Sequence, residues 1–350
     1  MMLRRLGLAL CIMLGVSFSV TTAHAADSVA DFYRGKVISM YVGFTVGAGY
    51  DVHNRLVARY IGKYIPGNPT VVPLNMEGAG SLKLTNWLCN VAPKDGTAIG
   101  VIARGIPFEP LLGSTPPASI RFDALKFNWL GSTTDEVSVC VAWERAGINK
   151  LDDLYRKELI VSGVGIGGDP DVYPMVASGV LGAKFRLVSG YPGGADLEFA
   201  MERGEVDGRC GWSWSSILST KKEWLDEGKI KVLLQLALKP HPELTARGVP
   251  WILDLARNEE ERQILRAVVA RSALGRPFML PPGVPLERVA ALRAAFNKVV
   301  TDPQFLADAK RQRLEITPLT GEGVHQTLSL AYDTPKPILE RARAMLAKKF

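Results

Sequence analysis

Cysteine and histidine are scarce in this chain, whose 350 residues contain four of each. The first 25 residues hold one of each, so the cysteines of the remainder are Cys89, Cys140 and Cys210. No CxxC pair occurs and the histidines lie far apart, so we expect no metal site of the usual ligand spacing. Three cysteines leave at least one unpaired or paired with another chain. Small buried thiols and a Cys140–Cys210 disulfide both remain open.

Dense charge and the local motifs of common enzymes are also missing. The formal net charge is +7, and removing Arg4 and Arg5 lowers it by two, to +5. The surplus is spread along the chain, which gives no sign of a nucleic-acid surface. No GxSxG elbow occurs, and no local motif suggests a Ser/His/Asp set. The sequence therefore predicts neither an enzyme nor a partner of nucleic acid.

Long hydrophobic runs are absent except at the start of the chain. Residues 6–20 are apolar, follow Arg4 and Arg5, and precede the small-x-small sequence Ala23-His24-Ala25. This pattern predicts a signal peptide over residues 1–25 with cleavage before Ala26. A membrane anchor is the alternative, but the run is shorter than the roughly 20 apolar residues of a comfortable span. We expect an exported, periplasmic protein, and a monomer.

One motif suggests a different ligand. Gly163, Gly165 and Gly168 satisfy GxGxxG after a strand-like segment, as in dinucleotide-binding proteins. The acidic residue expected about 20 positions later is missing, and the charged residues there are Lys184 and Arg186. The sequence therefore predicts no bound dinucleotide and no other cofactor.

Four Gly-rich turns are the most informative feature that is present. They span residues 46–50, 77–81, 163–168 and 191–195, each between a strand-like and a helix-like segment. Such a turn leaves backbone N–H groups unpaired at a helix N-terminus, where the helix dipole favours an anion. Several turns that converge predict a carboxylate-sized cage without a fixed cation. The predicted ligand contacts are Phe44, Val46, Gly47, Ala48, Tyr50, Gly78, Ala79, Gly80, Ser81, Gly165, Gly167, Gly168, Tyr191, Gly193, Gly194, Ala195 and Trp212.

Strand-like and helix-like segments alternate along the chain, which predicts α/β architecture with parallel sheets. Two such units occur, and the chain returns to the first after the second. We expect two lobes, residues 26–132 with 270–350 and residues 133–269, with a hinge of two crossings and a ligand cleft at the carboxyl ends of the strands. The predicted strands are 37–42, 70–74, 97–103, 137–143, 158–162, 185–189, 205–210, 230–238 and 273–280, with a helix over 252–269 and two final helices.

Several side chains near the turns allow more than one interpretation. Asp51 is suited to cap the helix after the first turn. Trp212 and Trp214 alternate at strand spacing and face one side, either as core packing or as an aromatic wall for the ligand. Arg209 suits a salt bridge or a second ligand carboxylate, and Tyr50 suits ligand contact or the cleft rim.

Five short motifs occur in a fixed order and resemble those of one family. Residues 43–51 read GFTVGAGYD against the family's PFPPGGGTD, and residues 76–81 read MEGAGS against RPGAGG. Residues 94–96 read KDG against PDG, 191–195 read YPGGA against YKGGA, and 204–207 read GEVD against GxVD. In these motifs the chain resembles the tripartite tricarboxylate transporter receptor family, the Bug or TctC-like periplasmic solute-binding proteins.

This resemblance implies a type II periplasmic binding-protein fold and a receptor that closes on a small organic acid. It implies a membrane transporter as partner, and a ligand carboxylate held mainly by loop backbone groups and ordered waters. A signalling system served by a sensor protein, or an exported enzyme with the same fold, are the alternatives. The family's prolines are missing at Thr45 and Val46, and Gly211 replaces an aspartate that meets ligand amino groups. The resemblance therefore does not carry over the identity of the acid.

Overall fold

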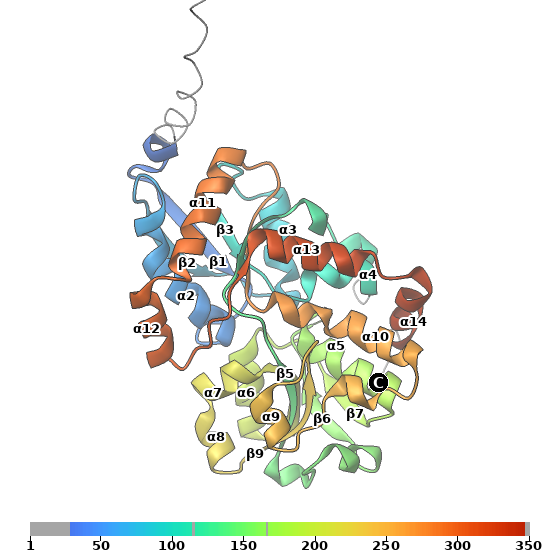
Figure 1. Ribbon diagram of the computed structural model, residues 1–350. Coiled ribbons are helices and arrows are strands. Elements are labelled where there is room, and N and C mark those ends of the chain that lie inside the picture. Colours follow the sequence, from blue (N-terminus) through green and yellow to red (C-terminus); the bar gives the residue numbers. More distant parts are fainter. Residues whose placement is uncertain (1–28, 114–115, 166, 347–350) are drawn as a thin grey trace, which may run out of the picture.

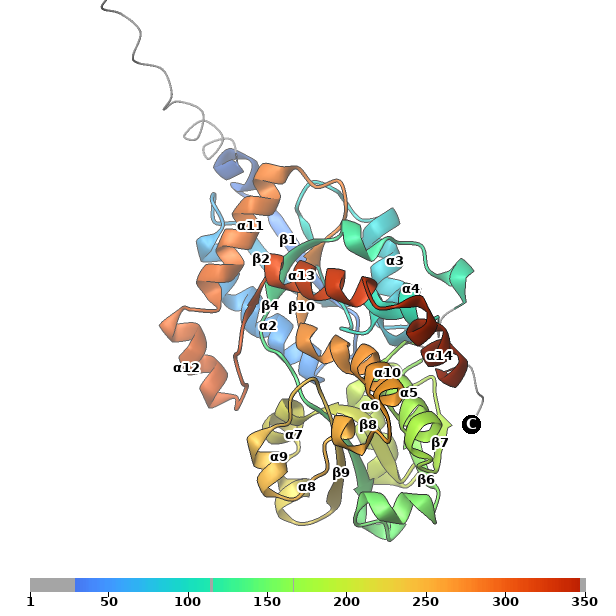
Figure 2. The ribbon, with the colours of Figure 1, turned by 45° about the vertical axis from the view of Figure 1, so that its right-hand side comes forward.

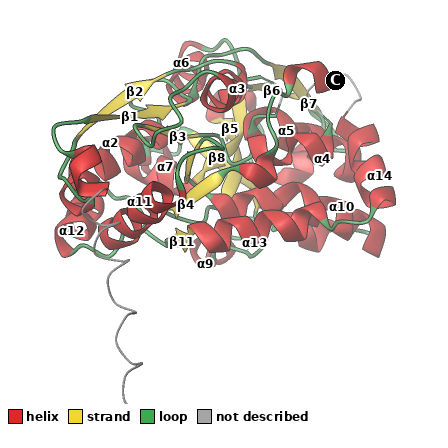
Figure 3. Cartoon of the chain, turned by 90° about the horizontal axis from the view of Figure 1, so that it is seen from above, coloured by secondary structure: helices red, strands yellow, loops and turns green. Residues whose placement is uncertain are grey.

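The computed structural model describes residues 29–113, 116–165 and 167–346, so the predicted signal peptide over residues 1–25 lies outside the described residues. The described chain forms two α/β lobes, each built around its own sheet (Figure 1). Viewed from above, helices α11, α13, α10 and α14 lie along one side of the molecule (Figure 3). No helix in the described ranges has the length and apolar character needed to cross a membrane.

The first lobe contains a sheet of six strands in the order β11-β4-β10-β3-β1-β2. β1 is parallel to β2 and β3, whereas β10 is antiparallel to β3 and β4. The predicted strands in this lobe are found, but the one predicted over 273–280 begins only at Pro277, because Ala270–Leu274 forms a 3₁₀ turn. β4 and β11 were not predicted. The strands are β1 (Val37–Val42), β2 (Thr70–Asn75), β3 (Ala98–Val101), β4 (Asn128–Ser132), β10 (Pro277–Leu280) and β11 (Leu319–Thr320).

The second lobe contains a sheet of five strands in the order β7-β6-β8-β5-β9. β6 is parallel to β7 and β8, but β5 is antiparallel to β8 and β9. The prediction of parallel sheets is therefore wrong, because β5 and β10, the first strands after each crossing, enter their sheets in the opposite direction. The strands are β5 (Ser138–Trp143), β6 (Leu159–Ser162), β7 (Phe185–Val188), β8 (Gly208–Ser213) and β9 (Ile230–Leu236).

The two crossings between the sheets are hydrogen-bonded to each other. The Arg276 amide donates to Ser132 Oγ at 2.9 Å, and the Glu136 amide donates to the Ser272 carbonyl at 3.1 Å. The crossings therefore form a paired connection. The predicted lobe limits, 26–132 with 270–350 and 133–269, stay a prediction.

The helices differ from the prediction mainly near the C-terminus. The segment predicted as one helix over 252–269 is a 3₁₀ turn (Ile252–Leu255) followed by α10, which begins where Asn258 Oδ1 accepts from the Glu261 amide. Four helices, instead of two, follow β10. The α-helices are α2 (Gly49–Ile61), α3 (Leu82–Asn90), α4 (Glu109–Leu112), α5 (Asp169–Val176), α6 (Gly194–Arg203), α7 (Trp214–Thr220), α8 (Lys222–Asp226), α9 (Pro242–Ala246), α10 (Glu259–Val269), α11 (Leu286–Val299), α12 (Pro303–Arg311), α13 (Gly321–Tyr332) and α14 (Lys336–Leu346).

The last helix, α14, packs against elements of both lobes (Figure 2). It contacts α4, which follows the first three strands, and α5, which follows β6. Arg343 Nε donates to the Leu111 carbonyl at 2.7 Å, and Arg341 pairs with Glu260 of α10 at 2.8 Å. The C-terminal helix is therefore a contact between the lobes that is separate from the two crossings.

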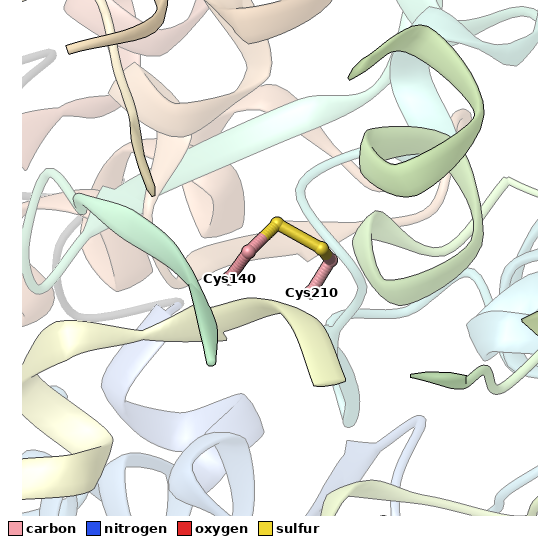
Figure 4. The surroundings of a disulfide bond; sticks show 2 residues. All are labelled: Cys140 and Cys210. Atoms are coloured by element: carbon pink, nitrogen blue, oxygen red, sulfur yellow. A yellow bond between two sulfur atoms is a disulfide. The ribbon is translucent and has the colours of Figure 1, made fainter. Parts of the chain in front are cut away.

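One disulfide connects two neighbouring strands of the second sheet. Cys140 of β5 is bonded to Cys210 of β8 (Figure 4). The register of these strands shifts between Val139 and Val141, which places a bulge at the bond. Cys89 is free and buried. The alternative of three buried thiols is wrong, because both bonded cysteines lie on adjacent strands.

Candidate functional site

A cavity of about 50 Å³ lies between the lobes. Its first-lobe wall follows the ends of β1 and β3, and its second-lobe wall follows β6 and includes β8. This is the region beyond the carboxyl ends of strands where α/β proteins bind ligands. The lining residues are Phe44, Ala48, Gly49, Tyr50, Ala103, Arg104, Val164, Gly168, Asp169, Pro170, Gly194, Glu198, Arg209, Gly211, Trp212, Ser213, Ser216 and Arg276.

Three helices begin at this cavity. The first residues of α2, α5 and α6 are Gly49, Asp169 and Gly194, and all three line the wall. Neither α2 nor α6 has a side-chain cap at its first turn. Backbone N–H groups and the positive ends of the helix dipoles therefore converge on the cavity, which favours an anion.

The backbone N–H groups of the first turn and of the third turn are partly occupied by carboxylates of the chain. The Gly47 amide donates to Asp51 Oδ2 at 2.9 Å. The Val164 and Gly165 amides donate to Asp171 Oδ2 at 2.8 and 3.0 Å. The expectation that these turns leave such groups unpaired is wrong, because an aspartate in the first turn of each following helix reaches back. Asp51 is not the N-cap, which is Ala48.

The second turn packs against the third turn across the lobes. The Gly80 amide donates to the Val164 carbonyl at 3.2 Å. A Cβ added at Gly80 would lie 3.3 Å from the Gly168 amide nitrogen, so only glycine allows this approach without displacement. Ala79 and Ser81 also have positive φ, at 46° and 82°. This strained turn connects the lobes beside the cavity and does not line it.

The structure brings together six of the residues predicted to contact ligand. Phe44, Ala48, Tyr50, Gly168, Gly194 and Trp212 line the cavity. The others lie outside its wall, and they are Val46, Gly47, Gly78, Ala79, Gly80, Ser81, Gly165, Gly167, Tyr191, Gly193 and Ala195.

The two alternating tryptophans have different surroundings. Trp212 lines the cavity and also packs against Trp224, with ring centroids 6.2 Å apart. Trp214 begins α7, and its Nε1 donates to Glu243 Oε2 at 3.3 Å, away from the cavity. Both side chains belong to one cluster of buried hydrophobic residues, which supports core packing for both, and Trp212 alone of the two also lines the cavity.

Three buried arginines line the cavity, so the expectation of a cage without a fixed cation is wrong. Arg104 donates to Asp169 Oδ2 at 2.5 Å, to Ser138 at 2.6 Å and to Ser213 at 3.2 Å. Burial opposes its charge, but the Asp169 carboxylate and other neighbours raise the pKa of Arg104. Arg104 follows β3 in the first lobe and its partners belong to the second, so this side chain bridges the lobes.

Arg209 and Arg276 are less completely paired. Arg209 Nη1 donates to the Gly194 carbonyl at 3.1 Å, and the guanidinium lies 4.8 Å from the Trp212 ring. Burial lowers the pKa of Arg209 to about 10. Arg276 Nη2 donates to Ser216 Oγ at 2.9 Å, and its guanidinium lies 4.3 Å from the Tyr50 ring. The Nε of each cation is buried and has no hydrogen-bond partner among the described residues.

Two acidic side chains share the wall with these cations. Asp169 pairs with Arg104, whereas Glu198 Oε1 is 3.5 Å from Arg209 Nη1. Burial raises the pKa of Glu198. The site therefore offers arginine donors together with carboxylates that can accept from a hydroxyl or amine of a ligand.

The place of the three arginines in the sequence could have indicated their role at the cavity. Arg104 follows an apolar strand, Arg209 lies in one, and Arg276 immediately precedes one. A charged residue at the end of a buried strand in an α/β protein lies where ligands bind. The family motifs are rich in glycines, so they give no indication of Arg104 or Arg276.

The described residues contain no group of three or more His, Cys, Asp or Glu side chains arranged to hold a metal ion. His53 is buried, and its Nδ1 is 2.9 Å from Thr133 Oγ1. Burial and the charge of Arg276 lower the pKa of His53 well below its ordinary value. Its surroundings therefore favour the neutral imidazole.

No family model matches the sequence, and a search of curated proteins gives no match. Solved structures do match. The periplasmic binding protein BugD has a TM-score of 0.69 and 18% identity over 89% of this chain and 98% of its own. MatC from Rhodopseudomonas palustris with bound malate has a TM-score of 0.66 and 17% identity over 89% and 99%. A second R. palustris protein, with adipate, has a TM-score of 0.66 and 16% identity over 88% and 97%.

At these identities the likeness concerns architecture. BugD, MatC and a TctC solute-binding protein from Polaromonas each align over nearly their whole length. The chain therefore has the two-lobed fold of the Bug and TctC periplasmic binding proteins, in agreement with the resemblance of its motifs.

Proposed function

We propose that this protein is a periplasmic receptor that binds an organic carboxylate between its lobes and delivers it to a tripartite tricarboxylate-type transporter. The observation that carries the proposal is the cavity between the lobes, where three helix N-termini and three arginines converge. Structures of the same fold contain malate and adipate, which supports a carboxylate as the ligand.

The test is a binding screen on the purified mature protein. Aliphatic and aromatic acids, with their primary amides as neutral controls, are titrated into the protein by calorimetry. The melting temperature of the protein is also measured with each compound. A bound acid at a hundredfold excess over its dissociation constant is expected to stabilise the protein by about 2.7 kcal/mol. If only amides, sugars or cations raised the melting temperature, the proposal would be contradicted.

The export step has its own test. Periplasmic protein from the host is expected to begin at Ala26, because residues 23–25 form the only good cleavage site after the apolar run. N-terminal sequencing decides this. Membrane-bound protein that still begins at Met1 would contradict a receptor that diffuses in the periplasm.

A further inference from the structure

Arg209 and Arg276 are buried cations with unsatisfied donors at the cavity. Their exposed fractions are 7% and 1%. The Nε atom of each is buried and has no hydrogen-bond partner in the described part of the chain. Arg104, in contrast, uses Nε, Nη1 and Nη2 in hydrogen bonds. Since a buried unpaired donor is costly, the two less paired arginines need a further acceptor.

Each of the two guanidinium groups lies beside the first residue of a helix that begins at the cavity. A Cβ added at Gly49 would be 3.1 Å from Arg276 Nη2. A Cβ added at Gly194 would be 3.3 Å from Arg209 Nη2 and 3.4 Å from the Cβ of Ala48. The first residue of α2 is therefore next to Arg276 and that of α6 next to Arg209, in the wall of one cavity, and both helices lack a side-chain cap.

The acidic neighbours neutralise these two cations incompletely. Glu198 is 3.5 Å from Arg209 Nη1, and Glu136 Oε2 is 4.0 Å from Arg276 Nη2, which is beyond hydrogen-bonding distance. Burial lowers the pKa of Arg209, the charge of Glu198 opposes this effect, and the charges of Arg276 and Arg104 lower the pKa further. An anion between the two arginines relieves this repulsion and provides the missing acceptors.

We propose that one carboxylate group of the solute bridges Arg209 and Arg276 at the N-terminus of α2. This inference rests on the proposed function and specifies which side chains recognise the acid. Arg209 comes from β8 of the second lobe, and Arg276 immediately precedes β10 of the first. The anion therefore contacts one cation from each lobe, so binding and lobe closure are coupled. Side-chain charge selects the acid, in addition to the backbone groups of the turns.

A double-mutant-type cycle tests this assignment, in which the arginine is replaced in the protein and, separately, the carboxylate is replaced by an amide in the ligand. The probes are adipate, malate and acetate, each with its primary amide, titrated by calorimetry. Arg209→Gln and Arg276→Gln are expected to lose at least about 30-fold affinity for the acid that the wild type binds best, since each loses one partner of a buried charge pair. Affinity for the amide is expected to change less than about fivefold. Arg186→Gln is the control, because Arg186 is half exposed, pairs with Glu158 on the surface and does not line the cavity.

The outcomes separate this inference from the proposed function. A wild type that binds no acid contradicts the proposed function. A wild type that binds an acid while both Gln variants keep its affinity overturns the arginine bridge and leaves the receptor in place. Equal losses for acid and amide also overturn the bridge, because they indicate a general packing defect.

Melting of the ligand-free variants shows whether they fold. Arg209→Lys and Arg276→Lys retain the charge and replace the planar fork, so they serve if a Gln variant fails to fold. Each Lys variant is expected to bind the acid more weakly than the wild type and still prefer it to the amide. A folded Lys variant without that preference overturns the bridge.

Discussion

Replacement of Gly80 by alanine is expected to weaken ligand-induced closure of the lobes more than it lowers the free energy of unfolding. Gly80 has φ 57°, donates to the Val164 carbonyl and approaches the Gly168 amide nitrogen. The added Cβ would lie 3.3 Å from that nitrogen and 3.5 Å from the Gly165 carbonyl oxygen. These contacts exist only when the second and third turns meet, so the substitution acts on the closed arrangement.

The expected effect has two parts. Alanine at positive φ costs about 1 kcal/mol of folding free energy, whether the lobes are open or closed. Weakening of the hydrogen bond to Val164 costs about 1 kcal/mol, and relief of the close contact costs about 1 kcal/mol more. The second part, about 2 kcal/mol, opposes closure, and it corresponds to about a 30-fold weaker apparent affinity for the ligand.

Gly35 provides a matched control. Its φ is 70°, and a Cβ added there has no heavy atom within 4 Å. Gly35→Ala therefore carries the same backbone cost without a contact between the lobes. Both variants are melted without ligand and titrated with the acid that emerges from the binding screen.

The two variants are expected to melt at similar temperatures and to differ in affinity. If Gly80→Ala binds the acid within twofold of Gly35→Ala, the contact between the second and third turns does not contribute to ligand-induced closure. If Gly80→Ala melts at a lower temperature than Gly35→Ala but binds the acid with the same affinity, the close contact affects folding and not closure, which also contradicts the reasoning.

Three further predictions follow from the disulfide, from a buried histidine and from the cavity. The Cys140→Ala/Cys210→Ala double variant is expected to lose about 4 kcal/mol of unfolding free energy in urea, because the bond closes a 70-residue separation; an unchanged midpoint contradicts this. Since the pKa of His53 is lowered in the folded state, its contribution to stability is present above pH 6.5 and falls as the pH drops below that value, by up to about 1.4 kcal/mol per pH unit. Urea titrations at pH 7, 6 and 5 are expected to show that the unfolding free energy falls less with decreasing pH in His53→Asn than in the wild type. If it falls equally in both proteins, His53 is not the cause. The cavity of about 50 Å³ has room for roughly four water-sized groups, which is the number of non-hydrogen atoms in acetate, so calorimetry across straight-chain acids is expected to favour acetate over adipate.

The strands were predictable because their apolar residues are continuous and their ends are marked by turns. Val37–Val42 forms β1 with the predicted limits, and Ile230–Leu236 differs from its prediction at one end only. Strand direction was not predictable in the same way. The order of segments does not reveal that β5 and β10 enter their sheets reversed after the crossings.

The hydrogen-bond acceptors of the backbone N–H groups in the Gly-rich turns could not be predicted from the sequence. Sequence shows a Gly-rich turn before a helix, but not whether an aspartate such as Asp171 folds back onto that turn. Nor does it show that Gly80 finds its acceptor on a loop more than 80 residues away. The same limit applies to Arg104 and Arg276, whose position at the cavity depends on packing between the lobes.

The position of α14 has a mechanical consequence for the proposed receptor. α14 packs against α4 and against α5, so any movement of one of these helices relative to the other changes at least one of its two contacts. The hydrogen bond from Arg343 to the Leu111 carbonyl fixes the helix to α4, so its contact with α5 is the surface that must slide. In the proposed receptor, opening would therefore combine a hinge with shear, and part of the energy barrier to release of the solute would lie at α14, far along the chain from the site.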